Sequence, residues 1–329
     1  MKFGVRFDRE FSNSAVMAPP YANALPHLDV LWQAIQKEVK KGFYTVADAP
    51  TAFPCSINAV GAVVKKGKCR VATGADGPHD ALDPEGRPLS VNGAHPSPDA
   101  ELEDMKWLTI SHSLNMSEIL YSLFELLSQE LSAERLELLR PTVWAVDASS
   151  YFRRIHTCNR DKPRQSLLFP APDGPKILNS DTMIFGMSEA PQKSQEIAYV
   201  TDDMQRIGTR EWWDRVRKIA EGKLPAPTEL RQAAQGVCPP ELAAWIDRRA
   251  DELGIDQADT MPTLQYIDDR KGGAMGNTAM VAGWLVAVDN SQPHHLDFPL
   301  EASKTQGGTT SSHTCDTHVC LNTPNLPTL

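Results

Sequence analysis

Three short segments of the chain carry residue types that suit the transfer of phosphoryl groups. In V-W-A-V-D-A-S-S-Y-F-R-R-I, a buried apolar run ends on Asp147, and an aromatic residue, Phe152, follows shortly after. In M-I-F-G-M-S-E-A-P-Q-K-S-Q, a proline suited to a first helical turn is followed by Gln195. The segment L-Q-Y-I-D-D is apolar at its start and ends on Asp268 and Asp269. Each segment therefore delivers a polar side chain to the end of a regular element.

Two strands that each carry an aspartate to the same edge of a sheet suit a two-metal site. Magnesium prefers hard oxygen ligands, and carboxylates from separate strands can share two ions about 3.5–4 Å apart. One ion would lower the pKa of an attacking hydroxyl, and the other would neutralise a leaving pyrophosphate. Taken singly, each aspartate also fits an ordinary turn at a strand end. The three segments together, in this order, favour the metal site.

Hydrophobic periodicity predicts the elements that must position these residues. Apolar spacing predicts a helix at 28–43, two helices at 117–139 that are broken near Ser132, and further helices at 211–220, 241–253 and 278–288. A hairpin is predicted at 53–72 around Gly67, and a second hairpin around the turn at 172–174. A helix begins at Ala190-Pro191, and a strand at 262–267 ends in the two aspartates. The R-K-G-G that follows Asp269 predicts no return strand, because glycine disfavours strands.

In this order the segments resemble the fingers and palm of a reverse transcriptase (an RNA-directed DNA polymerase) of the retrotransposon or retroviral type. V-D-A-S-S-Y-F-R-R-I resembles the first catalytic palm motif, and M-I-F-G-M-S-E-A-P-Q-K-S-Q the opening of the following FG-x-x-x-AP-x-x-x-Q helix. Y-I-D-D resembles the Tyr-x-Asp-Asp hairpin, and P-L-E-A-S-K-T-Q the last palm element. Upstream, G-A-V-V-K-K-G-K-C-R-V-A resembles the fingers hairpin, and Q-K-E-V-K-K-G-F-Y the helix before it. The resemblance spans roughly residues 28 to 306.

The resemblance implies an α+β fold, a right-hand polymerase fingers and palm, with an antiparallel palm sheet and helices on one face. The long spacing before Tyr266 leaves room for a helical insertion, and the composition after residue 306 is that of a disordered tail. The expected organisation is 1–45, an N-terminal segment and the helix leading into the fingers; 46–140, the fingers region; 141–200, the first part of the palm; 201–260, the helical insertion; 261–305, the second part of the palm; and 306–329, the disordered tail.

Roles for individual residues follow from the resemblance. It makes Asp147, Asp268 and Asp269 the catalytic residues and the ligands of two Mg²⁺ ions. The residues implied to bind the nucleotide are Lys65, Lys66 and Arg70 on the triphosphate, Phe152 as a gate against a ribose 2′-hydroxyl, and Gln195 beside the templating base or primer. The residues implied to contact primer or template are Tyr266, Arg153, Arg154 and Lys304.

The implied partners are an RNA or DNA template with its primer, and deoxynucleoside triphosphates. A catalytically decayed retroelement remnant that only binds nucleic acid is the main alternative. The aromatic residue at Phe152 and the A-P-x-x-x-Q helix disfavour an RNA-templated RNA polymerase, and the three carboxylates disfavour a helical interaction protein. No apolar periodicity after Gln306 predicts a thumb, so we expect weak processivity.

Composition limits the class of protein. The 329 residues are 41% hydrophobic, which suffices for packed cores and excludes a wholly disordered chain. The chain has 33 basic and 42 acidic side chains, a net charge of −9. This balance argues against a surface that is basic all over for binding nucleic acid, but it allows a local basic channel. No long apolar run or signal sequence is present, so we expect an intracellular protein, cytoplasmic or nuclear and not secreted. Two histidines and two cysteines at 313–320 lie too close together in sequence to enclose one zinc ion. This favours a disordered tail over a zinc site for this segment.

Overall fold

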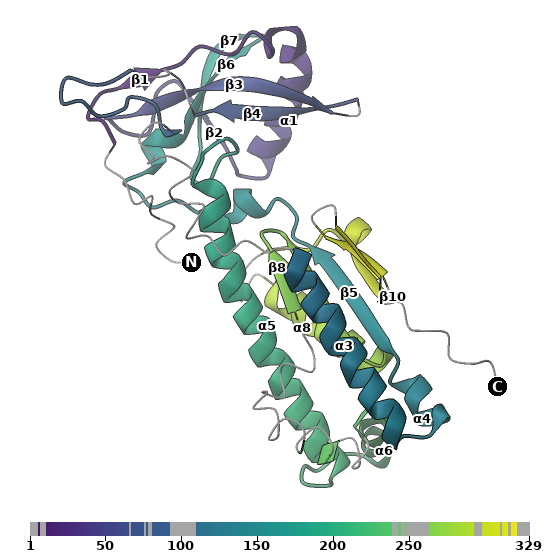
Figure 1. Cartoon of the computed structure of the whole chain (residues 1–329). Coiled ribbons are helices and arrows are strands. Elements are labelled where there is room, and N and C mark those ends of the chain that lie inside the picture. Colours follow the sequence, from purple (N-terminus) through teal and green to yellow (C-terminus); the bar gives the residue numbers. More distant parts are fainter. Residues whose placement is uncertain are drawn as a thin grey trace. The chain divides into compact units, whose positions relative to one another are not determined.

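The chain folds into two compact units, each built from separate stretches of sequence. The computed structural model describes residues 6, 11–65, 67–75, 77, 81–92, 110–238, 243–244, 248, 263–292, 298–309, 311–314 and 317–320. The first unit comprises Met1–Lys106 and Ser150–Ser194, and the second comprises Trp107–Ser149 and Gln195–Leu329 (Figure 1). The segment 141–200, expected to form one part of the palm, is therefore divided between the units, because its first strand pairs in one sheet and its hairpin in the other.

The first unit is a six-stranded sheet with a helix packed on it. Strands β1, β3, β6, β7 and β2 follow one another across the sheet, and β4 pairs with β3. Helix α1 contributes Leu31 and Ile35, one turn apart, to the core, and Trp32 stacks on Phe169 with ring centroids 5.2 Å apart. The elements are β1 (Val16–Met17), α1 (Leu28–Lys40), β2 (Thr45–Ala47), β3 (Ser56–Lys65), β4 (Lys68–Gly74), β6 (Ser166–Ala171) and β7 (Gly174–Asn179), with single-turn 3-10 helices η1 (Leu25–His27), η3 (Tyr151–Arg154) and η4 (Lys162–Gln165).

The second unit is built on an antiparallel sheet of four strands in the order β10-β5-β9-β8. Among the residues that the structure describes, five α-helices accompany it, and α5 is the longest of them at 31 residues. The elements are α3 (Ile110–Glu130), α4 (Ala133–Leu138), β5 (Pro141–Asp147), α5 (Ala190–Ala220), α6 (Thr228–Val237), β8 (Thr263–Tyr266), β9 (Asp269–Met275), α8 (Asn277–Asn290), η6 (Ala302–Lys304), β10 (Gln306–Thr309) and the paired strands β11 (Ser311–Thr314) and β12 (Thr317–Cys320).

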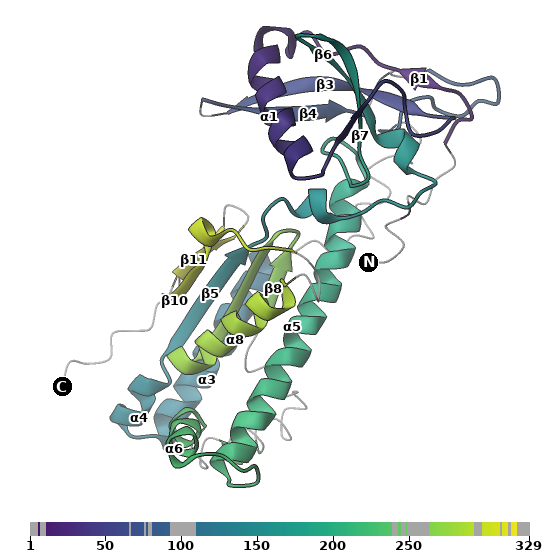
Figure 2. The same ribbon diagram turned by 180° about the vertical axis from the view of Figure 1, so that it is seen from behind.

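Helices cover both faces of this sheet, and the expectation of helices on one face is wrong. Successive side chains of a strand point to opposite faces, and Val143 packs with Leu120 of α3. The next residue, Trp144, lies against α8, where a Cβ on Gly283 would come 2.8 Å from its Nε1. Figure 1 shows α3 in front of the sheet, and Figure 2, from behind, shows α8 in front. All seven residues of β5 are buried, so both of its faces need a cover.

A return strand follows the two aspartates, contrary to the expectation from R-K-G-G. Strand β9 pairs with β5 along its whole length and with β8 on its other side. A Cβ on Gly272 would lie 2.3 Å from the Trp144 ring, and one on Gly273 would lie 2.3 Å from Leu120 Cδ1. The two glycines make room for these large side chains in the neighbouring layers. Close packing on both faces thus outweighs the low strand propensity of glycine.

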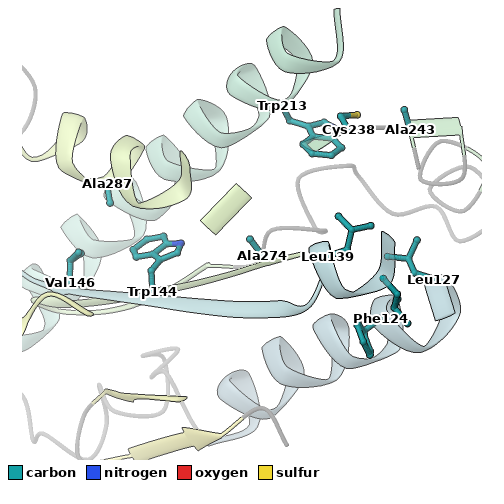
Figure 3. Packing of buried hydrophobic residues seen from close by; sticks show 11 residues of the cluster. Phe124, Leu127, Leu139, Trp144, Val146, Trp213, Cys238, Ala243, Ala274 and Ala287 are labelled. Atoms are coloured by element: carbon teal, nitrogen blue, oxygen red, sulfur yellow. The ribbon is translucent and has the colours of Figure 1, made fainter. Parts of the chain in front are cut away.

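Aromatic and aliphatic side chains from distant segments form the core of the second unit. Trp144 and Val146 of β5 share a cluster with Phe124 of α3 and Trp213 of α5, and Figure 3 shows this packing from close by. Cys238, which closes α6, belongs to the same cluster. The helix carrying Trp213 therefore packs on the sheet through its tryptophan.

Several local predictions are confirmed, and two are corrected. The helix at 28–43, the hairpin around Gly67 and the helix break near Ser132 are all present. Helix α5 runs through residue 200, so the expected insertion does not begin at a break in structure. The expected disordered tail from 306 instead supplies β10, because β5 offers it a free edge, and then the β11–β12 pair. Across the part of the chain that the structure describes, no helix has the length and apolar character needed to cross a membrane.

Candidate active site

The three aspartates of the sequence motifs come together at one end of the four-stranded sheet. Asp147 is the last residue of β5, and Asp269 is its direct partner on β9. Asp268 belongs to the two-residue turn between β8 and β9, and its carbonyl accepts the Ala148 N–H at 2.9 Å. The antiparallel pairing of β5 with β9 therefore produces the shared sheet edge that the sequence predicts.

The electrostatics of this edge are those of a crowded acidic site with a cation beside it. Burial raises the pKa of Asp268 above its usual range, and the neighbouring charge of Asp147 raises it further. The Lys304 ammonium donates a 2.5 Å hydrogen bond to Asp147 Oδ2. This bond raises the pKa of Lys304, and the charges of Asp147, Asp268 and Asp269 raise it further. The carboxylates thus repel one another, and a positive charge beside them is stabilising.

The donor chemistry of this edge fits a magnesium ion. Carboxylate oxygens are the ligands that Mg²⁺ prefers, and the like-charge repulsion between Asp147 and Asp268 is relieved by a nearby cation. Within the described ranges, no group of three or more His, Cys, Asp or Glu side chains stands in an arrangement that could hold a metal. The ligand role of all three aspartates stays a prediction.

The turn that carries Asp268 has an unusual backbone. Ile267 has a φ of +52°, in the left-handed region that β-branched residues rarely adopt. Gln195 Oε1 accepts the Ile267 N–H at 3.0 Å, and Gln265 Nε2 donates to the Ile267 carbonyl at 3.0 Å. Strain of this kind, about 1–3 kcal/mol, persists where the surroundings hold it in place and is frequent at functional sites.

Gln195 does not lie where the sequence prediction put it. Its side chain is 2% exposed, and its Nε2 donates to the Gln265 carbonyl at 3.1 Å. Both ends of the amide are thus occupied by the backbone of β8 and its turn, so the expected contact with a template base or primer is corrected. Gln265 was missed by sequence reasoning, although a glutamine inside the short apolar strand L-Q-Y-I is the signal that could have revealed it.

The expected phosphate-binding residues lie on the β3–β4 hairpin of the first unit. Lys65 ends β3, Arg70 lies on β4, and both side chains are exposed. Gly67, with a φ of +72°, makes the turn between the strands. Lys66 lies outside the described residues. A role in triphosphate binding stays a prediction for this hairpin.

Arg153 is a structural residue, and its expected contact with the primer or template backbone is wrong. It is 3% exposed, and its guanidinium donates to the carbonyls of Phe43 at 2.7 Å and Met183 at 2.9 Å. It also lies over the Tyr44 ring, 4.2 Å from the centroid. Arg154, half-buried, lies 5.5 Å from the centroid of Phe43. Paired arginines thus fasten η3 to the segment after α1.

Phe152 is half-buried in the first unit beside a second phenylalanine. Its ring lies 5.3 Å from that of Phe185, which is 51% exposed, so the two form a partly open aromatic surface. The following residue, Gly186, cannot carry a side chain, because a Cβ would lie 1.9 Å from the Thr73 carbonyl oxygen. Asn92 accepts the Ser188 N–H and donates to the Gly186 carbonyl, both at 2.8 Å. These contacts tie the second motif to β4, and sequence reasoning missed them.

Two further expected residues lie close to the aspartates in sequence or space. Tyr266 ends β8 opposite Asp269, and its side chain lies outside the described part of the chain. Lys304 is on η6 and pairs with Asp147. Its role toward primer or template stays a prediction.

Comparisons with known proteins give matches of structure and none of sequence. No protein-family profile and no curated protein matches the chain. It is similar to the crystal structure of a prototype foamy virus protease–reverse transcriptase mutant, with 11% identity and a TM-score of 0.48, covering 94% of this chain and 28% of that one. It is also similar to a foamy viral protease–reverse transcriptase in complex with double-stranded DNA, with 12% identity, a TM-score of 0.44 and coverage of 97% and 37%. The chain thus spans well under half the length of these solved proteins.

Proposed function

We propose that this chain is a nucleotidyltransferase that copies a template by adding deoxynucleotides to a primer, with RNA as the template that the motifs favour. The observation that carries the proposal is the meeting of Asp147 with Asp268 and Asp269 at one end of an antiparallel sheet. These aspartates come from segments far apart in the sequence, and each is the one that the motif resemblance selects. Ordinary turn aspartates have no reason to meet in this way.

In this proposal the primer 3′-oxygen attacks the α-phosphorus of a deoxynucleoside triphosphate. The bond between the α-phosphorus and its bridging oxygen breaks, and pyrophosphate leaves. When bound, two Mg²⁺ ions would activate the attacking oxygen and neutralise the leaving group. Asp147, Asp268 and Asp269 would hold them, and the Lys304 ammonium adds a positive charge to this edge.

Other residues would position the substrates. Lys65 and Arg70, with Lys66 between them in sequence, would contact the triphosphate through charge-assisted hydrogen bonds. Phe152 would exclude a 2′-hydroxyl by filling its space. Arg154, Tyr266 and Lys304 are the remaining proposed contacts to primer or template.

Primer extension tests the proposal directly. The purified chain is incubated with a poly(rA) template, an oligo(dT) primer, dTTP and Mg²⁺. We expect extended primers from the parent and none from Asp147→Asn or Asp268→Asn. Asp214→Asn, which removes an exposed ion pair on α5, is the matched control and should extend like the parent.

A binding assay on the same template–primer separates the two functions that the sequence leaves open. Extension that depends on the two aspartates supports the polymerase. Tight binding by parent and variants alike, with no extension by any of them, refutes it in favour of a remnant that only binds nucleic acid. Extension that persists in Asp268→Asn refutes the assignment of the site.

A further inference from the structure

The turn between β8 and β9 is not one that its own sequence favours. Tyr266 pairs with Asp269, so Ile267 and Asp268 form a two-residue hairpin loop. Such loops need a positive φ at their first position, where glycine, asparagine or aspartate is usual. Here that position is an isoleucine with a φ of +52°. Contacts outside the turn must therefore hold it, and the direction of the Asp268 carboxylate depends on them.

Two buried glutamines supply those contacts. Gln195 and Gln265 are 2% and 3% exposed, and between them they bond both backbone polar groups of Ile267. Gln195 also donates to the Gln265 carbonyl, which links the start of α5 to β8. Because both side chains are almost fully buried, removing one leaves the backbone groups of Ile267 without a ready replacement partner.

The second glutamine is itself held in one orientation. Arg270 Nε donates to Gln265 Oε1 at 2.9 Å, and the Thr201 hydroxyl lies against the same oxygen. Because this oxygen accepts from Arg270, the Gln265 amino group is directed toward the turn. The set of contacts therefore runs from α5 through β8 and β9 to the residue that precedes Asp268.

We propose that Gln195 is a positioning residue: it holds Ile267 in its left-handed conformation and so keeps the Asp268 carboxylate beside Asp147. This inference rests on the proposed function, because Asp268 matters only if the edge is catalytic. Gln195 acts through the turn, and its buried amide touches no substrate. Its removal lets the turn relax to an ordinary conformation and moves the carboxylate away from its partner.

The test is Gln195→Met, which keeps the length of the side chain and removes both hydrogen bonds. Amide exchange is followed by NMR on chain labelled with ¹⁵N-isoleucine. We expect the Ile267 amide to exchange at least ~10-fold faster, while the Ile219 amide of the same helix is unchanged. In primer extension we expect kcat to fall about 100-fold with KM for dTTP within about twofold, since a misplacement of ~1 Å has that effect.

Matched variants separate positioning from general loss of stability. Thr209→Val removes a buried hydroxyl of α5 that donates to the Gln205 carbonyl within the helix and not to the turn, and it should change neither readout. Gln195→Glu keeps an oxygen to accept the Ile267 N–H and should restore its protection. If Gln195→Met does not fold, Gln265→Met removes the bond to the Ile267 carbonyl and carries the same expectations.

Each result decides one question. Unchanged Ile267 exchange in Gln195→Met, or equally faster exchange at Ile219, overturns the positioning role. Faster Ile267 exchange with an unchanged kcat overturns it as well. A parent chain that extends no primer refutes the proposed function, and with it the catalytic meaning of the positioning, while the exchange rates still report whether Gln195 holds the turn.

Discussion

Gly272→Ala is expected to destabilise the second unit severely, although it adds only one methyl group. An ideal Cβ at this position lies 2.3 Å from Cε2 and Cζ2 of Trp144 and 2.5 Å from its Nε1. Carbon atoms pack at about 3.5–4.0 Å, so the ring and the strand must separate by more than ~1 Å. Trp144 is 2% exposed, and α8 approaches the same ring closely at Gly283, so the indole has little room to move.

The size of the effect follows from overpacking. Extra methyl groups in a packed core cost about 1–3 kcal/mol, and a rigid ring held on two sides places this variant near 3 kcal/mol. For a unit of this size, each kcal/mol lowers the midpoint of thermal unfolding by roughly 2–4 °C, so we expect a fall of about 6–12 °C. Thermal unfolding followed by circular dichroism measures it, with urea unfolding as a second measure.

Two other glycines provide graded controls. A Cβ on Gly273 also comes within 2.3 Å of a neighbour, but that neighbour is the end of the flexible Leu120 side chain, so Gly273→Ala should cost less. Gly236 on α6 is exposed and has nothing within 4 Å, and its replacement by alanine should be neutral or stabilise by up to ~1 kcal/mol. Trp144→Leu should recover part of the loss when combined with Gly272→Ala. An unfolding midpoint of Gly272→Ala within 2 °C of the Gly236→Ala value would refute the packing argument.

Three further predictions concern charge and substrate selection. Burial and the charge of Asp147 raise the pKa of Asp268, so the folded chain loses stability as pH rises from ~4 through the raised pKa. Asp268→Asn removes this ionisation and should unfold at a higher temperature than the parent at pH 7, but not near pH 4. The variant should also extend no primer. Burial alone would raise the pKa of Asp83, but hydrogen bonds with Ser12 and with the backbone and side chain of Arg87 lower it to about 2. The stabilisation by the ionised Asp83 is present above pH ~4 and is lost as pH falls toward 2. An Asp83→Asn variant with the parent's full acid sensitivity in that window would contradict this. Phe152→Ala should allow ribonucleotides to be incorporated in primer extension, and an unchanged preference for dTTP over UTP would reject its role as a gate.

Much of the candidate site could be predicted from the sequence because the relevant signals are local. A buried run that ends on Asp147, a proline that opens α5 and an apolar strand before two aspartates are patterns of a few residues each. The pairing of β5 with β9 then brings the aspartates together, as the order of the motifs indicates. The hairpin around Gly67 is likewise set by a turn residue between two strand-like runs.

Tertiary structure alone decided which polar side chains face inward. The local sequence around Arg153 and Gln195 is the same whether these side chains contact a substrate or backbone groups of the chain. In the folded chain both side chains are buried and bond to backbone groups. Local propensity also argued against β9, and contacts with Trp144 and Leu120, from segments more than a hundred residues away, outweighed it. Propensity acts within a few neighbouring residues, whereas burial and close packing depend on segments that meet only in the folded chain.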